Sequence, residues 1–211
     1  MTERYKGKPS VEKEPLPGKL IAVYGINNIG KSTQVSMLMS ALAAEGCSVE
    51  RRKSPGYERA SGEVINAILR EGREAQPQEL QQWQAINMHQ EQSSLYRALG
   101  EGKIVVTEDY WGTTLAWGLG HGLSREDLDA MISELRVPDI AVLMHGNRFT
   151  EAIESGHLHE ENDDLTTRVQ AHHLELAREF GWHIVDANQS KADVHSQIMS
   201  LVSEKVYVGE H

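Results

Sequence analysis

The sequence is poor in cysteine. Cys47 is the single cysteine among 211 residues, so the chain cannot form a disulfide within itself. Proteins of oxidising compartments use disulfides freely, whereas thiols stay reduced in the cytosol. The scarcity of cysteine therefore excludes a disulfide-stapled fold, and we expect a cytoplasmic protein.

Long apolar runs are also missing. No stretch approaches the roughly 20 consecutive apolar residues that a membrane-spanning helix needs. Residues 1–18 carry charges and three prolines but no apolar segment, so they do not resemble a secretory signal. We expect no membrane partner, a disordered lead-in over residues 1–18, and one folded domain over residues 19–205.

Positive charge is in deficit. The chain has 21 Lys and Arg residues against 31 Asp and Glu residues, which gives a formal net charge of −10. A protein of this charge gains little from releasing the counterions of a phosphate backbone. The composition therefore argues against a nucleic-acid partner, although a local basic pocket for a small anion stays compatible with it.

What the sequence does contain is a regular alternation of strand-like and helix-like segments. Short segments that look like strands, most of them apolar, occur at Leu20–Tyr24, Ser48–Lys53, Lys103–Thr107, Ile140–Met144 and His183–Asp186. This alternation predicts an α/β fold of three layers, a five-stranded parallel sheet with helices on both faces. Ligands of such sheets bind beyond the carboxyl ends of the strands.

The segments between these strands have helical spacing. Residues 35–42 place apolar side chains at i, i+3, i+4 and i+7, and Gly46 follows as a stop signal. Ser124 precedes a segment with acidic residues in its first turn, which is typical of a capped helix. Further helices are predicted over Pro77–Leu99, around Leu165–Phe180, and from about Ser190.

Residues 25–32, GINNIGKS, fit the phosphate-binding pattern G-x-x-x-x-G-K-[ST] between a predicted strand and a predicted helix. The glycines let the backbone curl so that N–H groups face phosphate oxygens, and the helix adds the positive end of its dipole. We expect Lys31 to reach the β- and γ-phosphates of ATP or GTP, and Ser32 to ligate Mg²⁺. The predicted residues of this nucleoside triphosphate site are Gly25, Asn28, Ile29, Gly30, Lys31, Ser32 and Thr33.

One polar segment departs from the strand–helix rhythm. Residues 145–164 include GHLHEENDD and have no strand pattern. A polar insertion of this length is either a mobile lid or a plain surface loop, and we expect a lid because it accompanies a phosphate loop. The histidines here and at 172–173 do not have the spacing of a zinc site.

The chain resembles the thymidylate kinases, a family of P-loop nucleoside monophosphate kinases. The resemblance is carried by GKSTQ, by KSPG at residues 53–56, by WQAIN at residues 83–87, by ALGEGKIVVTEDYWGTTLAWG at residues 98–118, and by VPDIAVLM at residues 137–144. It implies a P-loop fold with a lid and often a homodimer. It also implies transfer of the γ-phosphoryl group of ATP, with Mg²⁺, to dTMP.

Several positions depart from the family pattern where charge is handled. Glu108, Asp109 and Tyr110 stand where the resemblance implies aspartate, arginine and tyrosine. Glu108 can still order a Mg²⁺ shell, but Asp109 replaces an arginine expected to hold the acceptor phosphate. His159 stands where a lid arginine often supplies a cation, and Arg148 could move with the lid or be a solvated charge.

The resemblance also implies an acceptor site. Asn87 takes the place of an arginine at the pyrimidine edge, and Arg59 lies where an arginine often holds the acceptor phosphate. Trp83 either stacks on the base or packs in the protein interior, and Trp117 is expected to wall the sugar pocket. The predicted substrate-binding residues are Arg59, Trp83, Asn87, Asp109, Tyr110 and Trp117, with Lys31 and Glu108 as the catalytic pair.

Three functions remain open at this point. The first is an ATP-dependent kinase of dTMP or a related nucleoside monophosphate. The second is a deoxynucleoside kinase, in which an acid at 108 or 109 acts as base toward a 5′-hydroxyl. The third is a catalytically impaired protein that binds a nucleotide without transferring its phosphoryl group.

Overall fold

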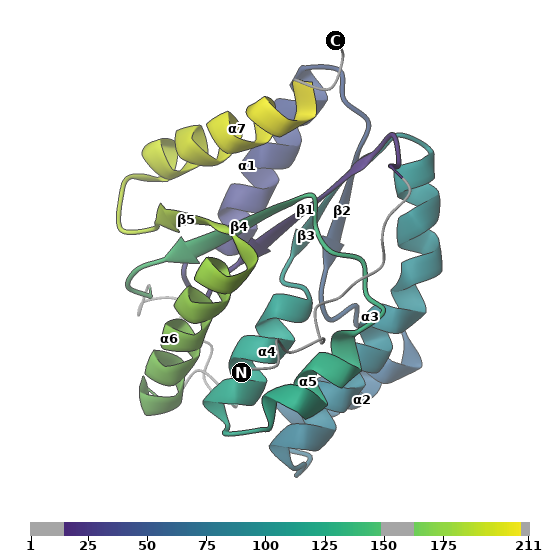
Figure 1. The fold of residues 1–211 in the computed structure, drawn as a ribbon, viewed down its shortest axis with the longest axis vertical. Helices are drawn as coiled ribbons and strands as arrows, with labels where there is room; N and C mark the ends of the chain where they lie inside the picture. The colour runs from purple at the N-terminus through teal and green to yellow at the C-terminus, as the bar shows by residue number, and fades with distance from the viewer. Residues whose placement is uncertain (1–14, 149–162, 208–211) are drawn as a thin grey trace, which may run out of the picture.

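The computed structural model describes residues 15–148 and 163–207, and it confirms the predicted fold class. Five parallel strands form one sheet in the order β2-β3-β1-β4-β5 (Figure 1). Each strand lies within one residue of its predicted position at either end. The strands are β1 (Lys19–Tyr24), β2 (Val49–Lys53), β3 (Ile104–Glu108), β4 (Ile140–His145) and β5 (His183–Asp186).

Helices cover both faces of the sheet (Figure 1). On one face α1 (Lys31–Ala44) packs beside α7 (Lys191–Tyr207). On the other face α3 (Pro77–Gly100), α4 (Trp111–Gly120) and α6 (Asp163–Phe180) lie together, with α2 (Ala60–Arg70) against α3 and α5 (Arg125–Ile132) against α3 and α4. Ser124 caps α5 as predicted, its hydroxyl accepting a hydrogen bond from the Asp127 amide. No helix in the described part of the chain is long and apolar enough to cross a membrane.

Two helices, α2 and α4, were not individually predicted from the sequence. The sequence of α4, WGTTLAWGLG, is rich in glycine and threonine, which form helices poorly in isolation. Packing overrides that preference, because a Cβ at Gly118 would collide with the Leu128 side chain, and one at Gly120 would lie 2.7 Å from a Val169 methyl group. The small residues therefore allow α4 to approach α5 and α6 closely.

Strand register brings the chemically important residues to one edge of the sheet. Val23 of β1 and Lys53 of β2 both pair with Glu108 at the end of β3. The strands are parallel, so their carboxyl ends meet where the chain leaves β1 for the loop before α1. The sheet thus places Lys53, Glu108 and that loop side by side.

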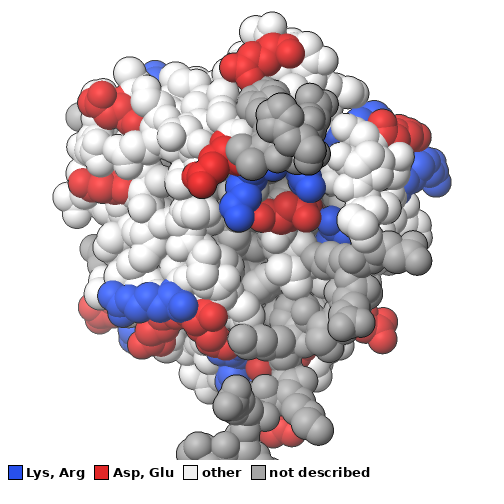
Figure 2. Space-filling view, turned by 45° about the horizontal axis from the view of Figure 1, so that its top comes forward, with Lys and Arg blue, Asp and Glu red and all other residues white. Residues whose placement is uncertain are grey.

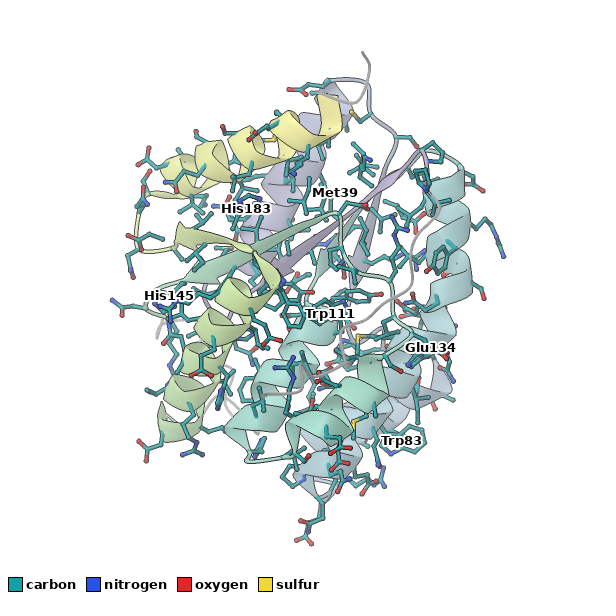
Figure 3. All side chains as sticks on the ribbon, viewed as in Figure 1. Met39, Trp83, Trp111, Glu134, His145 and His183 are labelled. Atoms are coloured by element: carbon teal, nitrogen blue, oxygen red, sulfur yellow. The ribbon has the colours of Figure 1, made fainter. Side chains whose placement is uncertain are left out.

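Trp111 is the largest fully buried side chain, and it joins the sheet to α4 and α6 (Figure 3). Its ring centroid lies 5.0 Å from that of Phe180 and 5.8 Å from that of Trp182, both edge-on. Its indole N–H donates to the Arg136 carbonyl at 3.3 Å. We expect Trp111→Ala to lower the free energy of unfolding by about 3–5 kcal/mol, because it removes a packed aromatic ring and leaves a cavity.

Urea denaturation followed by circular dichroism measures this loss. Trp83→Ala is the matched control, because Trp83 is only partly buried beside the small cluster formed by α2 and the start of α3. A loss at Trp111 no larger than that at Trp83 would contradict the central role of the Trp111 packing.

Candidate active site

The loop between β1 and α1 has backbone conformations that few residues adopt. Gly25 has φ 147°, and a Cβ there would lie 2.7 Å from the Met144 carbonyl oxygen. Asn28 has φ 59° and Gly30 has φ 94°, both in the left-handed region. The loop curls back to start α1 at Lys31, so the first N–H groups of that helix point toward the loop interior.

Lys31 folds over the loop that precedes it. Its Nζ donates to the carbonyl oxygens of Gly25 at 2.8 Å and Ile26 at 2.9 Å, and lies 3.6 Å from Asp109 Oδ2. The side chain is buried. The lysine charge is therefore held at the floor of the loop, where a phosphate group would replace the carbonyl contacts.

Glu108 is the meeting point of three donors. Its Oε1 accepts hydrogen bonds from Ser32 Oγ at 2.7 Å and Lys53 Nζ at 3.0 Å, and Arg51 donates to Oε2 at 3.1 Å. Burial alone would raise the pKa of Glu108, but the hydrogen bonds from Ser32 and Lys53 and the nearby positive charges outweigh it and lower the pKa. Glu108 is therefore a carboxylate at neutral pH, placed beside the Ser32 hydroxyl.

Asp109 follows with a left-handed backbone at φ 62°. Thr113 Oγ1 donates to its Oδ1 at 2.8 Å, opposite the side that faces Lys31. Burial raises the pKa of Asp109, and the Lys31 charge offsets only part of that effect. An acid thus occupies the position where the family resemblance implies an arginine.

A cavity of about 420 Å³ runs from this loop to the opposite wall. The loop end consists of residues 27–28 and 30–33, and the floor contains Lys53, Glu108, Asp109 and Thr113. The far wall is formed by Tyr57, Leu69, Arg70, Gln84, Thr114 and Trp117. One cavity therefore joins the predicted triphosphate site to a second, mixed polar and aromatic site.

The structure brings most of the predicted nucleotide-binding residues to this cavity. Asn28, Gly30, Lys31, Ser32 and Thr33 line it. Gly25 shapes the loop from beneath, and Ile29 is buried in the hydrophobic core. Of the predicted acceptor residues, Asp109, Tyr110 and Trp117 line the cavity.

The other predicted acceptor residues lie outside the cavity lining. Trp83 packs beside the cluster of α2 and the start of α3 at the edge of the molecule (Figure 3). Asn87 is fully buried and bonded to the backbone of Gly56. Arg59 lines a neighbouring hollow, 3.5 Å from Glu91.

The predicted lid falls largely outside the described residues. Residues 149–162, including His159, are in that part of the chain. Arg148 is half-buried just before it and is not part of the cavity lining.

Sequence reasoning missed five residues of the far wall, which are Tyr57, Leu69, Arg70, Gln84 and Thr114. Leu69 and Arg70 belong to α2, which was not predicted. Its signal was present, since residues 65, 68 and 69 give the i, i+3, i+4 spacing of a buried helix face. Arg70 lies at the end of this helix with its guanidinium 5.6 Å from the centre of the Tyr57 ring.

His173 of α6 is a buried titratable group near the site. Burial, with smaller contributions from the charges of Lys31 and His172, lowers its pKa from 6.5 to about 3. Between these values the unfolded chain binds a proton that the folded chain does not, so stability falls as the pH drops from about 6.5 toward 3. The slope from this one residue approaches about 1.4 kcal/mol per pH unit.

We expect His173→Gln to flatten this acid-side fall, because the substituted side chain does not titrate. Chemical denaturation at a series of pH values between 7 and 4 measures it. His172→Gln is the matched control, since that neighbour is more exposed and pairs with Glu175 at 2.9 Å. Equal pH profiles for wild type and His173→Gln would contradict the interpretation.

Lys and Arg are interspersed with Asp and Glu over the face shown in Figure 2, and they form no continuous positive surface there. This distribution agrees with the net charge of −10. The charged side chains that matter for the chemistry are those grouped around Glu108.

A phosphate loop between β1 and α1, with its lysine and serine facing a carboxylate at the end of β3, defines the P-loop class of nucleoside triphosphate-binding proteins. Within this class the chain belongs to the thymidylate kinase family, because the model of that family matches residues 23–198. The family resemblance noted from the sequence is thereby confirmed.

Individual relatives agree with this assignment. A thymidylate kinase of Schizosaccharomyces pombe is 26% identical over 193 residues, covering 88% of this chain and 92% of that protein. One of Nitrosospira multiformis is 29% identical over 201 residues, covering 88% and 97%. The solved structure of thymidylate kinase from Candida albicans superposes with a TM-score of 0.74 at 20% identity, covering 88% of this chain and 91% of that one, which shows the shared fold.

Proposed function

We propose that the protein transfers the γ-phosphoryl group of ATP to dTMP, giving ADP and dTDP. The observation that carries this proposal is the single cavity that joins the phosphate loop to a second polar and aromatic wall, in a chain of the thymidylate kinase family. Phosphoryl transfer requires donor and acceptor to be held in line, and neutralising charge does most of the remaining work.

The donor half of the site is assigned to the loop and the start of α1. The triphosphate lies along residues 28–33, where N–H groups and the positive end of the helix dipole face it. Lys31 moves from the carbonyl oxygens that it contacts in the structure to the β- and γ-phosphates. The burial of this lysine supports the assignment, because a charge in a water-poor site acts more strongly than one in solvent.

The residues present fit a magnesium ion. Ser32 Oγ and Glu108 Oε1 lie 2.7 Å apart, and hydroxyl and carboxylate oxygens are the ligand types that Mg²⁺ prefers. Ser32 would hold the ion directly and Glu108 through water. The bound ion would neutralise phosphate charge and orient the transferring group.

The acceptor half is assigned to the far wall and the floor of the cavity. Trp117 offers an apolar surface for the nucleoside, and Gln84 and Thr114 offer hydrogen bonds, Thr114 donating to Gln84 at 3.3 Å. Lys53, which is half-exposed beside Glu108, is placed to contact the acceptor phosphate. It supplies a positive charge on a floor where position 109 carries an acid.

The two other functions inferred from the sequence are less well supported. A deoxynucleoside kinase and a catalytically impaired nucleotide-binding protein are both compatible with the phosphate loop alone. Family membership over residues 23–198 favours the monophosphate kinase. The homodimer implied by the resemblance and the cytoplasmic location expected from the scarcity of cysteine stay predictions, and size-exclusion chromatography with light scattering tests the first of them.

The decisive experiment is coupled ADP release from ATP–Mg²⁺ over a panel of nucleoside monophosphates and nucleosides. Turnover with dTMP above the other acceptors is the expected result. Turnover confined to nucleosides would replace the proposal with the second function. If no acceptor in the panel is phosphorylated while ATP binding is still measurable by calorimetry, the third function, a catalytically impaired nucleotide-binding protein, would remain.

A further inference from the structure

Asn87, in the middle of α3, is bonded to both backbone polar groups of one residue, Gly56, in the segment that forms part of the cavity wall. The Gly56 amide donates to Asn87 Oδ1 at 2.8 Å, and Asn87 Nδ2 donates to the Gly56 carbonyl at 2.9 Å. The same Nδ2 donates to Ser61 Oγ at 2.9 Å. The side chain is 0% exposed, so these bonds are made where water cannot replace them.

The segment that Asn87 holds joins β2 to α2 and forms part of the cavity wall. Pro55 and Tyr57 on either side of Gly56 both line the cavity. The same segment separates this cavity from the neighbouring hollow of about 450 Å³, which Pro55, Gly56 and Tyr57 also line. A shift of this segment would therefore change the shape of the acceptor wall directly.

Asn87 also ties the start of α2 to α3. Ser61, which accepts from Asn87, donates to Gln90 Oε1 at 2.8 Å. Gly62 packs so closely on Gly56 and Tyr57 that a Cβ would collide with their backbone. Leu69 and Arg70, at the far end of α2, line the cavity. One hydrogen-bond network therefore positions both the segment that contains Gly56 and helix α2.

Only a carboxamide can make this set of bonds. It offers an acceptor to the Gly56 N–H and donors to the Gly56 C=O and Ser61 Oγ at the same time. A carboxylate would lose both donated bonds, and an arginine would lose the accepted bond and bury a charge. Asn87 therefore has a role here that the arginine implied by the family resemblance could not perform.

We propose that Asn87 is a positioning residue that fixes the acceptor-side wall of the cavity, and that it does not contact the acceptor base. This inference rests on the proposed function for the identity of the acceptor. It differs from the sequence-based expectation, in which Asn87 bonds to the pyrimidine edge.

The two roles of Asn87 differ in how they affect acceptor choice. A positioning residue changes the KM of all acceptors by a similar factor, whereas a base contact changes the ratio between acceptors that differ in their bases. Asn87→Asp tests this, because it keeps the side-chain volume and removes the two donated bonds. Asn66→Asp is the matched control, since Asn66 lies on α2 and bonds the exposed Glu71.

We expect Asn87→Asp to raise the KM for dTMP and dUMP alike by at least about ten-fold, since unsatisfied buried groups cost on the order of a factor of ten each. The KM for ATP should stay within about two-fold of wild type, and Asn66→Asp should change neither constant. A changed dTMP-to-dUMP ratio would overturn the proposal in favour of a base contact. An equal rise in both the ATP and the acceptor KM would overturn it in favour of general damage.

Ser61→Ala serves as a milder variant if Asn87→Asp does not fold, because it removes the bonds of Ser61 to Asn87 and Gln90 and leaves both bonds between Asn87 and Gly56 in place. It should raise the acceptor KM by about three-fold, again equally for both acceptors. No rise with Ser61→Ala would count against the network.

A measurement that needs no turnover separates this inference from the proposed function. Hydrogen–deuterium exchange of residues 54–61 should be slow in wild type and at least about ten-fold faster in the Asn87 or Ser61 variant, while exchange of residues 25–33 stays unchanged. If wild type turns over no monophosphate but shows this exchange pattern, the proposed function fails and the positioning of the wall stands. Unchanged exchange over residues 54–61 would overturn the inference itself.

Discussion

Lys31→Ala should abolish phosphoryl transfer, lowering kcat/KM for ATP by on the order of 10³ or more, the scale reported for cations that stabilise a transferring phosphoryl group. Lys31 is buried and lies against the carbonyl oxygens of Gly25 and Ile26. It can therefore turn to phosphate oxygens without leaving the site. Steady-state coupled ADP release with dTMP as acceptor measures the loss, and Lys205→Ala is the control, because Lys205 is an exposed residue near the end of α7.

The variant must be shown to fold, because Lys31 also lies 3.6 Å from buried Asp109. Removing the lysine takes away the main offset to burial, which should raise the pKa of Asp109 further. The double variant Lys31→Ala with Asp109→Asn removes both charges, so that neither charge is left in the site without its partner. A folded double variant that regains near-wild-type turnover would refute the role of Lys31 in phosphoryl transfer.

The sequence was sufficient for the sheet and for the donor half of the site because these features have short-range signals. The three central strands β1, β3 and β4 are largely apolar runs, and buried parallel strands have that pattern. The edge strands β2 and β5 carry more polar residues and follow from the alternation of strands and helices. The phosphate loop requires glycine where φ is positive or where the backbone is crowded, as at Gly25. Such requirements are local, so they can be recognised without knowing what packs against them.

The acceptor half was less predictable because it depends on how α3 is rotated about its axis. Trp83 and Asn87 are four residues apart and lie on one helix face. In the structure this face meets α2 and the segment containing Gly56, and Gln84 faces the cavity instead. The pattern of α3 does not fix its rotation, since Leu80, Ala85 and other buried residues lie on more than one side.

The positively charged residues around the cavity could not be identified from single sequence positions either. Asp109 was expected to replace an arginine that holds the acceptor phosphate. The structure shows Lys53 from β2 and Arg70 from α2 lining the same cavity, and Arg51 bonded to Glu108 from its side. These residues are 39 to 58 positions away in sequence from Asp109, so their proximity is a property of the sheet and of α2.

We expect Glu108→Gln to raise the Mg²⁺ concentration that catalysis requires and to lower kcat. The substitution keeps the side-chain size but removes the negative charge that faces Ser32, Lys53 and Arg51. A carboxylate that orders a metal shell typically contributes about 10- to 100-fold to metal affinity or activity. We expect the half-saturating Mg²⁺ concentration to rise by about ten-fold and kcat to fall by about 10²-fold.

A magnesium titration at fixed ATP and dTMP, with EDTA-treated protein as the starting point, measures both effects. Glu101→Gln is the matched control, because Glu101 is an exposed acid paired with Lys103 at 3.0 Å, outside the cavity lining.

The lowered pKa of Glu108 adds a second readout, the pH dependence of activity. Since protonation would mimic the glutamine variant, wild-type activity should hold through neutral and mildly acidic pH and be lost only below the ordinary glutamate pKa of about 4.5, as Glu108 takes up its proton. If Glu108→Gln leaves the magnesium requirement unchanged while kcat still falls, Glu108 acts through the positions of Lys53 and Arg51 and not through the metal.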